Sequence, residues 1–548
     1  MHPEGVMKLV PYENRKLTFE DAFSDVPELR VSGADEPRVS ESGECWTKKI
    51  IGVGKKEFFE YLGLLEGTGW EPYAAHTRDP LQNIVYTASY TKNGRYLCAA
   101  FYDFDGVFLQ PKIIVTVGLL PESHLADPEE VFKEIPDIPG QPSGGVRTAD
   151  AGGGFGRRII PLVEKEDYES YLKALEAAGF SKDYDNSDGF DGRVYAAGFS
   201  KNGATVSVSY ISPTKQMCII AGKRGFSPYL SDETDRRSAL LPGACTSIHM
   251  LEMWGFGNSF VIRLKNGHFL VSDGGLRCEA PYLLDYLDSL TPEGEKPVVE
   301  GWFISHPHAD HTGVLVELAL NPVWGSRLRC EGIYFCEPPL ELMSVDASHI
   351  GVVGLMRMVG KNLRTASGRP VPFYRPCIGE RYFFADITLD VIMTYDLTRF
   401  KDFSGDLNDA GIWLMLTAEG QRVLLSGDGD LGGMKNIMSV YTTDYMNVDV
   451  MTALHHGWNT RNYFTNYCKP ETVLFTAYGE GPEKRRAENA YLRSVARECI
   501  SWGDGTVVLN FPYRVGEAER RSHFDFSLYN DGEERIALPN TGEKRKPQ

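Results

Sequence analysis

An internal repeat in the first half of the chain restricts the folds open to it. Residues 53–70 align with residues 163–180 at a shift of 110, and residues 85–94 align with residues 194–203 at a shift of 109. A solenoid needs about three copies before neighbouring repeats can share a core. Two copies therefore predict a tandem duplication of one small domain.

Each copy has the pattern of a helix beside a hairpin. Phe58, Tyr61 and Leu65 recur at helical spacing, and Gly69 stands where such a helix would end. Farther along, two alternating segments flank the pair Asn93-Gly94, which is a strong hairpin signal. Each repeat is therefore predicted to be an α+β domain, with one helix packed on a small antiparallel sheet.

Domain boundaries follow from changes in composition. The α+β repeat domains are predicted at residues 1–135 and 157–235, and the Gly- and Pro-rich segment 136–156 is interpreted as a linker. Over residues 240–540, strand and helix patterns alternate, which is typical of a layered α/β domain. The predicted fold class of the chain is therefore α/β.

Composition limits the partners and the compartment. Among the 548 residues, 75 acidic side chains outnumber 57 basic ones, and the formal net charge is −18. This charge disfavours nucleic acid as a partner, although a local basic groove stays possible. No segment approaches the roughly 20 apolar residues of a membrane-spanning helix, and the N-terminus has no signal-peptide pattern. The ten cysteines form no C-x-x-C pair, so we expect reduced thiols and a cytoplasmic protein without a membrane partner.

Residues with metal-binding chemistry follow the predicted strand 298–305. This strand leads directly into His306, His308, Asp310 and His311. Residues two apart on an extended chain share a side, so His306 and His308 can hold one cation. Once the chain turns, Asp310 and His311 can face a second. Imidazole with carboxylate suits Zn²⁺, and Mn²⁺ is the alternative.

Two later strands deliver further side chains of the same kind. An apolar strand in 422–430 leads to Asp428, and another in 451–459 leads to His455 and His456. Ligands of open α/β layers gather at the carboxyl ends of strands, so these residues are expected at the same site. Asp428 is interpreted as a carboxylate that bridges two metal ions.

With these motifs, the chain from residue 244 onward resembles the metallo-β-lactamase superfamily, and most closely its branch of competence-protein nuclease domains and phosphorylcholine esterases. The resemblance implies an αβ/βα sandwich with a dinuclear site at one edge. It implies a first metal ion held by His306, His308 and Asp428. It implies a second held by Asp310, His311, Asp428 and one of His455 or His456, with His456 favoured as the ligand, His455 facing the substrate and Asp273 orienting a ligand or loop.

The sequence departs from the family pattern in two places. Many members have a further histidine ligand before the bridging aspartate, and the candidate here is His349, in a predicted helix where a lone histidine is commonly structural. Trp458 stands where the branch usually has a small hydroxyl residue, which is expected to reshape the substrate pocket.

These residues predict a dinuclear metal-dependent hydrolase. Two cations about 3.5–4 Å apart lower the pKa of a bound water towards about 7 and stabilise an oxyanion. The expected substrate is a phosphodiester or a related ester, with a lactone or carboxyl ester as the alternative. Asp310, His455 and Asp430 are the predicted catalytic residues; His455 or Asp430 would protonate the leaving group, although Asp430 is equally interpreted as a solvated loop residue.

Two alternatives come from other functional classes. A di-iron redox protein of the same fold typically has a carboxylate at the position of His308 and an attached flavin domain, and this sequence shows neither. A non-catalytic scaffold would bind a protein partner through the repeats, but it would not need to retain metal ligands. The hydrolase is therefore the leading hypothesis.

Overall fold

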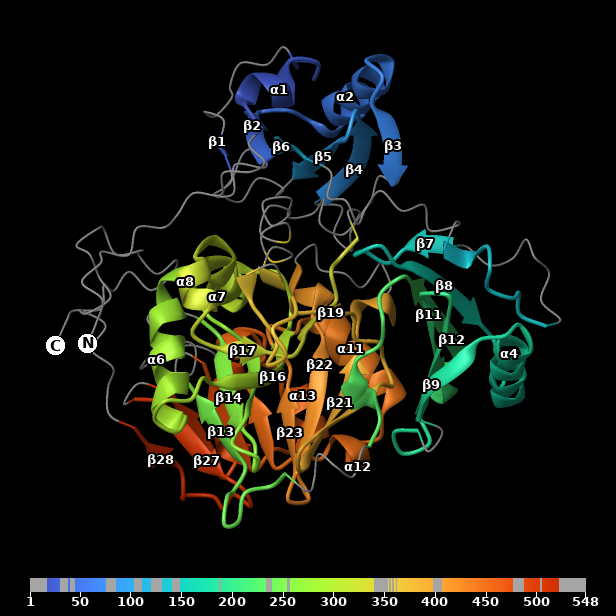
Figure 1. The fold of residues 1–548 in the computed structure, drawn as a ribbon. Helices are drawn as coiled ribbons and strands as arrows, with labels where there is room; N and C mark the ends of the chain where they lie inside the picture. Colours follow the sequence, from blue (N-terminus) through green and yellow to red (C-terminus); the bar gives the residue numbers. More distant parts are fainter. Residues whose placement is uncertain are drawn as a thin grey trace, which may run out of the picture.

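The computed structural model describes most of the chain. The described residues are 17–29, 38–39, 45–74, 85–102, 111–119, 131–139, 148–186, 189–232, 239–253, 257–339, 353, 356, 359–360, 362–397, 407–476, 487–502 and 505–521. Within them the chain forms two small sheets followed by two large ones (Figure 1). The α/β class predicted from the sequence is confirmed. Among the described helices, none has the length and apolar character required to cross a bilayer.

The first small sheet has the strand order β1-β2-β6-β5-β4-β3 and packs against α1 and α2. The buried side chains of Phe58, Tyr61 and Leu65 on α2 belong to its core. Its elements are α1 (Phe19–Phe23), β1 (Arg38–Val39), β2 (Cys45–Ile51), α2 (Lys55–Gly67), β3 (Glu71–Ala74), β4 (Val85–Lys92), β5 (Arg95–Tyr102) and β6 (Lys112–Leu119).

The second small sheet has the order β7-β8-β12-β11-β10-β9, which corresponds strand by strand to the first. Its elements are β7 (Thr148–Asp150), β8 (Gly156–Pro161), α4 (Lys165–Ala177), β9 (Ser181–Asn186), β10 (Val194–Lys201), β11 (Ala204–Ile211) and β12 (Gln216–Gly222). Helix α4 covers one face through Tyr168, Tyr171 and Leu175.

Part of the segment 136–156, interpreted above as a linker, belongs to the second sheet. Strand β7 lies inside it and pairs with β8. Upstream, Phe132, Ile135 and Ile138 are buried in the same core as α4. These three residues recur at every third position, but Pro136 and Pro139 interrupt the segment, so the pattern is too short to assign it to a domain.

Two large sheets pack face to face in the second half of the chain. The first has the order β19-β18-β16-β15-β14-β13-β27-β28, with β17 paired to β16, and the second runs from β20 to β26 in sequence order. The first comprises β13 (Ser247–Met250), β14 (Ser259–Arg263), β15 (Phe269–Asp273), β16 (Val298–Ile304), β17 (Arg329–Cys330), β18 (Ile333–Phe335), β19 (Phe373–Tyr374), β27 (Val507–Asn510) and β28 (Glu519–Arg520). The second comprises β20 (Arg381–Phe384), β21 (Ile387–Met393), β22 (Trp413–Ala418), β23 (Gln421–Leu425), β24 (Val450–Thr452), β25 (Thr472–Phe475) and β26 (Glu498–Ser501).

Both faces of the second large sheet are buried. Alternate residues such as Leu414 and Leu416 join a core that also contains Phe303 of the first large sheet, whereas Met415 joins the core of the outer helices. Burial on both faces explains why these strands are almost continuously apolar. The outer helices on this sheet are α11 (Leu431–Val440), α12 (Thr443–Met446), α13 (Asn462–Cys468) and α15 (Ala487–Val495); α6 (Ala280–Leu290), α7 (Ala309–Leu320) and α8 (Pro322–Gly325) lie along the other side of the molecule (Figure 1).

The second small sheet is docked on these layers. Ser209 Oγ donates a hydrogen bond of 2.6 Å to the carbonyl of Ile378, and Asn186 Nδ2 donates one of 2.8 Å to that of Gly379. Arg193 Nε reaches the last residue of α11, with 2.8 Å to the carbonyl of Val440. Three apolar residues of this repeat also belong to the core under the outer helices: Phe190, Val194 and Ile211. The repeat is therefore joined to the layers by both polar and apolar contacts.

Candidate metal centre

A strand, a tight turn and a helix place the first group of candidate ligands. Strand β16 ends at Ile304, and α7 begins at Ala309 with His308 as its extended N-cap residue. Asp310 and His311 therefore lie in the first turn of α7, where the helix dipole favours negative charge. Asp428 reaches the same point from the turn after β23. Gly427 there has φ +51°, and a Cβ atom on it would lie 2.8 Å from that of Ser305.

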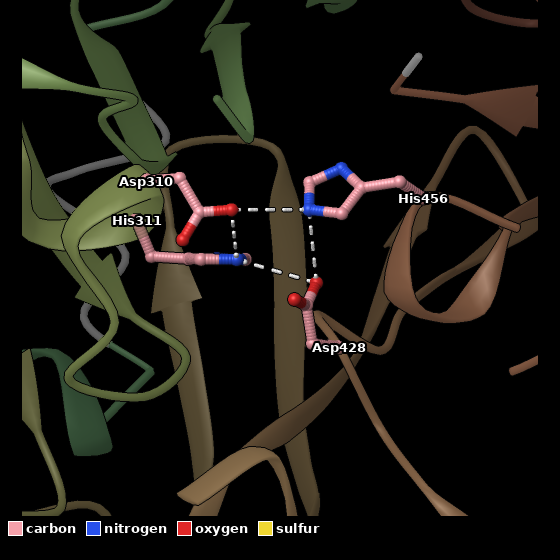
Figure 2. Close-up of side chains that lie close together, drawn as sticks. All are labelled: Asp310, His311, Asp428 and His456. Carbon is pink, nitrogen blue, oxygen red and sulfur yellow. Dashed lines mark ion pairs between the residues drawn. The ribbon is translucent and has the colours of Figure 1, made fainter. Parts of the chain in front are cut away.

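Asp310, His311, Asp428 and His456 form one compact group (Figure 2). His311 Nε2 lies 3.2 Å from Asp428 Oδ1 and 3.6 Å from Asp310 Oδ2. His456 Nε2 lies 3.4 Å from Asp428 Oδ1 and 3.3 Å from Asp310 Oδ2. Ligand atoms about 2.0–2.2 Å from a tetrahedral Zn²⁺ are about 3.3–3.6 Å apart. The spacing of these four side chains fits such an ion.

A second group shares the same aspartate. His306, His308 and Asp428 offer ligand atoms within 4.8 Å of one another. His306 Nε2 lies 3.9 Å from Asp428 Oδ2, the oxygen that does not face His311 and His456. The two carboxylate oxygens of Asp428 thus belong to different groups, one with three and one with four candidate ligands.

The remaining ring nitrogens are held by polar neighbours. His311 Nδ1 lies 2.8 Å from Asp273 Oδ2, and His456 Nδ1 lies 2.9 Å from the carbonyl oxygen of Thr476. These acceptors place the ring proton on Nδ1 and direct the Nε2 lone pair into the site, as in established metal centres. His306 Nδ1 contacts Ser305 Oγ at 3.0 Å. The buried Nε2 atoms of His306 and His311 have no hydrogen-bond partner, which is the condition expected of atoms that ligate a metal.

Asp273 is the centre of the supporting network. Its backbone has φ +58°, an uncommon value for a residue with a side chain. Its carboxylate accepts hydrogen bonds from Ser305 N at 2.7 Å, from Ser305 Oγ at 2.9 Å and from Asn258 Nδ2 at 2.7 Å, besides holding His311. Both oxygens of the carboxylate therefore hold neighbouring groups, among them the candidate ligand His311. The resemblance implies such an orienting role for Asp273.

Electrostatics favours positive charge at the centre. Burial alone would raise the pKa of Asp428, but the facing imidazoles of His311 and His456 hold it well below the usual range. Burial opposes protonation of His456, yet Asp428 and Asp310 raise its pKa to about 10. Burial, together with His311 and His308, lowers the pKa of His306 well below its usual value. The carboxylates thus attract protons in the absence of a cation, and a divalent ion would compete for the same positions.

His455 lies beside this centre, and its Nδ1 faces hydrogen-bond donors, whereas Nδ1 of His311 and of His456 faces acceptors. Asn459 Nδ2 is 2.9 Å and Asn408 Nδ2 is 3.4 Å from Nδ1 of His455. Amide N–H groups donate, so Nδ1 is the acceptor and the proton of the neutral ring is on Nε2. Nε2 lies 3.6 Å from Asp428 Oδ2, and the side chain is partly exposed. His455 and His456 both have positive φ, 50° and 54°, and their rings are inclined at 62° to each other.

The structure brings all six predicted ligands together in the two groups. Asp430 is the N-cap of α11, where Oδ1 accepts a hydrogen bond of 2.7 Å from Leu431 N, and it belongs to neither ligand group. His349 lies outside the described residues. Trp458, expected near the pocket, is partly buried directly after His456-Gly457.

Sequence reasoning missed the supporting residues Asn258, Ser305, Thr476, Asn408 and Asn459. Thr476 directly follows β25, whose parallel pairing with β24 puts its end beside that of the strand preceding His456. Its place after a short apolar strand was a usable signal. Asn408 lies in a short 3-10 helix (Leu407–Ala410) and Asn459 lies in a bend, and no spacing in the sequence links them to His455.

Comparison with known proteins adds no assignment. Neither a scan of family models nor a search of curated proteins finds a match to this chain. Function is therefore inferred from the residues and their geometry.

Proposed function

We propose that this chain is a dinuclear metal-dependent hydrolase of the metallo-β-lactamase type that acts on a phosphodiester or a related ester. The observation that carries the proposal is the position of Asp428. One of its oxygens lies with His311 and His456, and the other lies 3.9 Å from His306 Nε2. A buried carboxylate placed in this way is suited to bridging two cations.

The arrangement of the layers supports this proposal. Two sheets pack face to face, helices cover the outside, and the ligands follow the ends of β16, β23 and β24. This arrangement supports the proposal of an αβ/βα sandwich with its site at one edge. The matching strand orders of the two small sheets support tandem copies of one domain, which would serve as accessory domains for substrate access, oligomerisation or partner binding.

The donor set is nitrogen and carboxylate oxygen, which suits Zn²⁺ and admits Mn²⁺. When bound, the two ions would supply a water of lowered pKa and positive charge for the developing oxyanion. The protein's own residues prepare this site. Asp273 and Thr476 orient His311 and His456. Burial limits the access of bulk water to four of the candidate ligands: His306, His311, Asp428 and His456.

Proton transfer to the leaving group is assigned to His455. A neutral imidazole is too weak an acid for this step, so the donor would be the imidazolium form of His455, which would release the Nε2 proton on the side of Asp428. The side chain is partly exposed, so a substrate can reach it. Asp430 is less suited, because its carboxylate oxygen already accepts the first backbone N–H of α11. Asp310 lies within the four-ligand group and is therefore assigned to metal binding.

The proposal is tested first by metal content and then by substrate class. Protein purified without added metal should contain about two zinc or manganese ions per chain by inductively coupled plasma mass spectrometry, as a two-metal site requires. It should hydrolyse bis-p-nitrophenyl phosphate faster than p-nitrophenyl acetate. Hydrolysis of the acetate alone would favour the carboxyl-ester alternative. Iron in place of zinc would favour the redox alternative, and failure to take up any metal would reject the hydrolase.

A further inference from the structure

A small cavity with a mixed polar and apolar lining lies where the second small sheet meets the large sheets, and it shares no residue with the metal centre. Its volume is about 20 Å³, and its wall comes from both sides of the contact. Thr205, Ser207 and Arg224 come from the repeat, and Arg375, Glu380 and Tyr382 come from β20 and the segment before it. A volume of this size holds one water molecule or one monatomic ion of similar radius.

Two guanidinium groups line this cavity. Arg375 is buried, and its Nη2 donates to both oxygens of Asp396, at 2.8 and 3.0 Å. Its buried Nε has no hydrogen-bond partner. Arg224 is partly buried, and burial together with the nearby charge of Arg375 lowers its pKa. Among the described residues, no carboxylate forms an ion pair with Arg224.

The charges around the cavity do not balance. Arg157 also contacts Asp396, with 3.8 Å between Nη1 and Oδ1, so one carboxylate faces two arginines before Arg224 is counted. Asp396 lies behind Arg375 and does not line the cavity. The acidic residue in the wall is Glu380, which accepts hydrogen bonds from Tyr184, Tyr382 and the backbone N of Cys377. Burial raises the pKa of Glu380 to about 7, so it is only partly charged at neutral pH. Arg375 is buried and Arg157 and Arg224 are partly buried, so the excess positive charge at this place favours a bound counter-ion.

We propose that the cavity binds one small inorganic anion, chloride, between the Arg224 guanidinium and Nε of Arg375. The anion would satisfy the unpartnered Nε and offset the excess positive charge. Because its two arginines belong to different units, it would also link the second repeat to the large sheets. This site is independent of the proposed hydrolase activity, and its test needs no substrate.

Bromide replaces chloride in such sites and can be located directly. In crystals of the full chain grown in bromide, anomalous diffraction should show a peak within hydrogen-bond distance of Arg375 Nε. The peak should be absent in an Arg224→Gln variant. A water molecule without anomalous signal in the wild-type cavity would overturn the proposal.

Solution stability provides the second measurement. Replacing gluconate by chloride at constant ionic strength should raise the melting temperature of the full chain by roughly 2–4 °C, because the anion binds the native state alone. Arg224→Gln should lose this increase, whereas Lys223→Gln, which removes a neighbouring exposed charge, should keep it. An equal chloride response in Arg224→Gln would contradict the proposal. Bromide in the crystal without a chloride response in solution would mean an adventitious ion only and would also overturn it.

Discussion

Asp428 is the residue on which both ligand groups depend. Its substitution by Asn keeps the shape of the side chain but removes the charge and one of the two oxygens. We expect Asp428→Asn to lose both metal ions and to lower activity more than about 100-fold. This loss exceeds that typical of a residue that only orients a metal ligand. Metal content by mass spectrometry and phosphodiester turnover measure the two effects.

Asp430 provides the matched control two positions along the chain. Asn caps a helix as well as Asp does, so Asp430→Asn should keep α11, the metal content and the activity. A large loss of turnover in Asp430→Asn with full metal content would instead return Asp430 to the role of proton donor. Retention of two metal ions by Asp428→Asn would contradict the bridging role.

His455 and His456 offer a second matched pair because they are adjacent but assigned to different tasks. His456→Gln should lose the ion of the four-ligand group. His455→Gln should retain both ions and lower kcat by about 10²–10⁴, the usual contribution of a general acid. Metal stoichiometry combined with kcat separates the two roles. If His455→Gln also loses metal, His455 is a ligand and not the proton donor.

At the scale of elements, the glycine-rich loop between β7 and β8 contacts the first large sheet, although its composition is typical of a linker. Gly152 has φ +74°, and a Cβ atom on it would lie 2.0 Å from the carbonyl oxygen of Glu337. Glu337 follows β18 in the first large sheet. Through this loop the second repeat packs closely on the large sheets. Position 152 requires glycine both for its positive φ and for the close approach of its backbone to Glu337.

Replacing Gly152 by Ala should destabilise the protein through both effects. Gly203, in the hairpin between β10 and β11, has a similar φ of +82° but open space around it. Gly203→Ala should cost about 1–2 kcal/mol from backbone strain alone. Gly152→Ala should cost roughly 1–3 kcal/mol more because of overpacking. Urea denaturation of both variants measures the difference, and equal losses would show that the Glu337 contact is not tight.

At the scale of the whole molecule, Glu380 couples stability to pH. It lies between the second repeat and the large sheets, with Tyr184 on one side and Tyr382 on the other. Burial raises its pKa to about 7 from an ordinary value of 4.5. The native state therefore holds a proton that the unfolded chain releases above about pH 4.5. The stabilisation is complete below that pH and is lost as pH rises through about 7.

The difference between pKa values of about 7 and 4.5 corresponds to about 3 kcal/mol. We expect Glu380→Gln, which cannot titrate, to gain stability relative to the wild type by up to this amount as pH rises from about 5 to about 8. Urea midpoints of both proteins at fixed chloride concentration measure this change. Burial lowers the pKa of His249 to about 3. This histidine is present in both proteins, so its contribution to the pH dependence cancels in the stability difference. A stability difference that is constant over this range would place the pKa of Glu380 near its ordinary value.

Local patterns in the sequence determined the α/β class, the helix and the hairpin of each small sheet, the strands that lead to the candidate ligands, and the residues of the two ligand groups. His306, His308, Asp310 and His311 lie within six residues, so their proximity is a property of the local chain. Asp428 and His456 were predictable because apolar strands lead directly to them and the carboxyl ends of neighbouring parallel strands meet at one edge.

The tertiary structure decided what depends on contacts between distant segments. The tautomers that separate His455 from His456 are set by Asn459 and Thr476, and the cap position of Asp430 depends on where α11 begins. The docking of Gly152 on Glu337 joins residues 185 positions apart, from 152 to 337. Such contacts leave no periodic trace in the sequence, because periodicity reports which face of an element is buried and not which segment covers it.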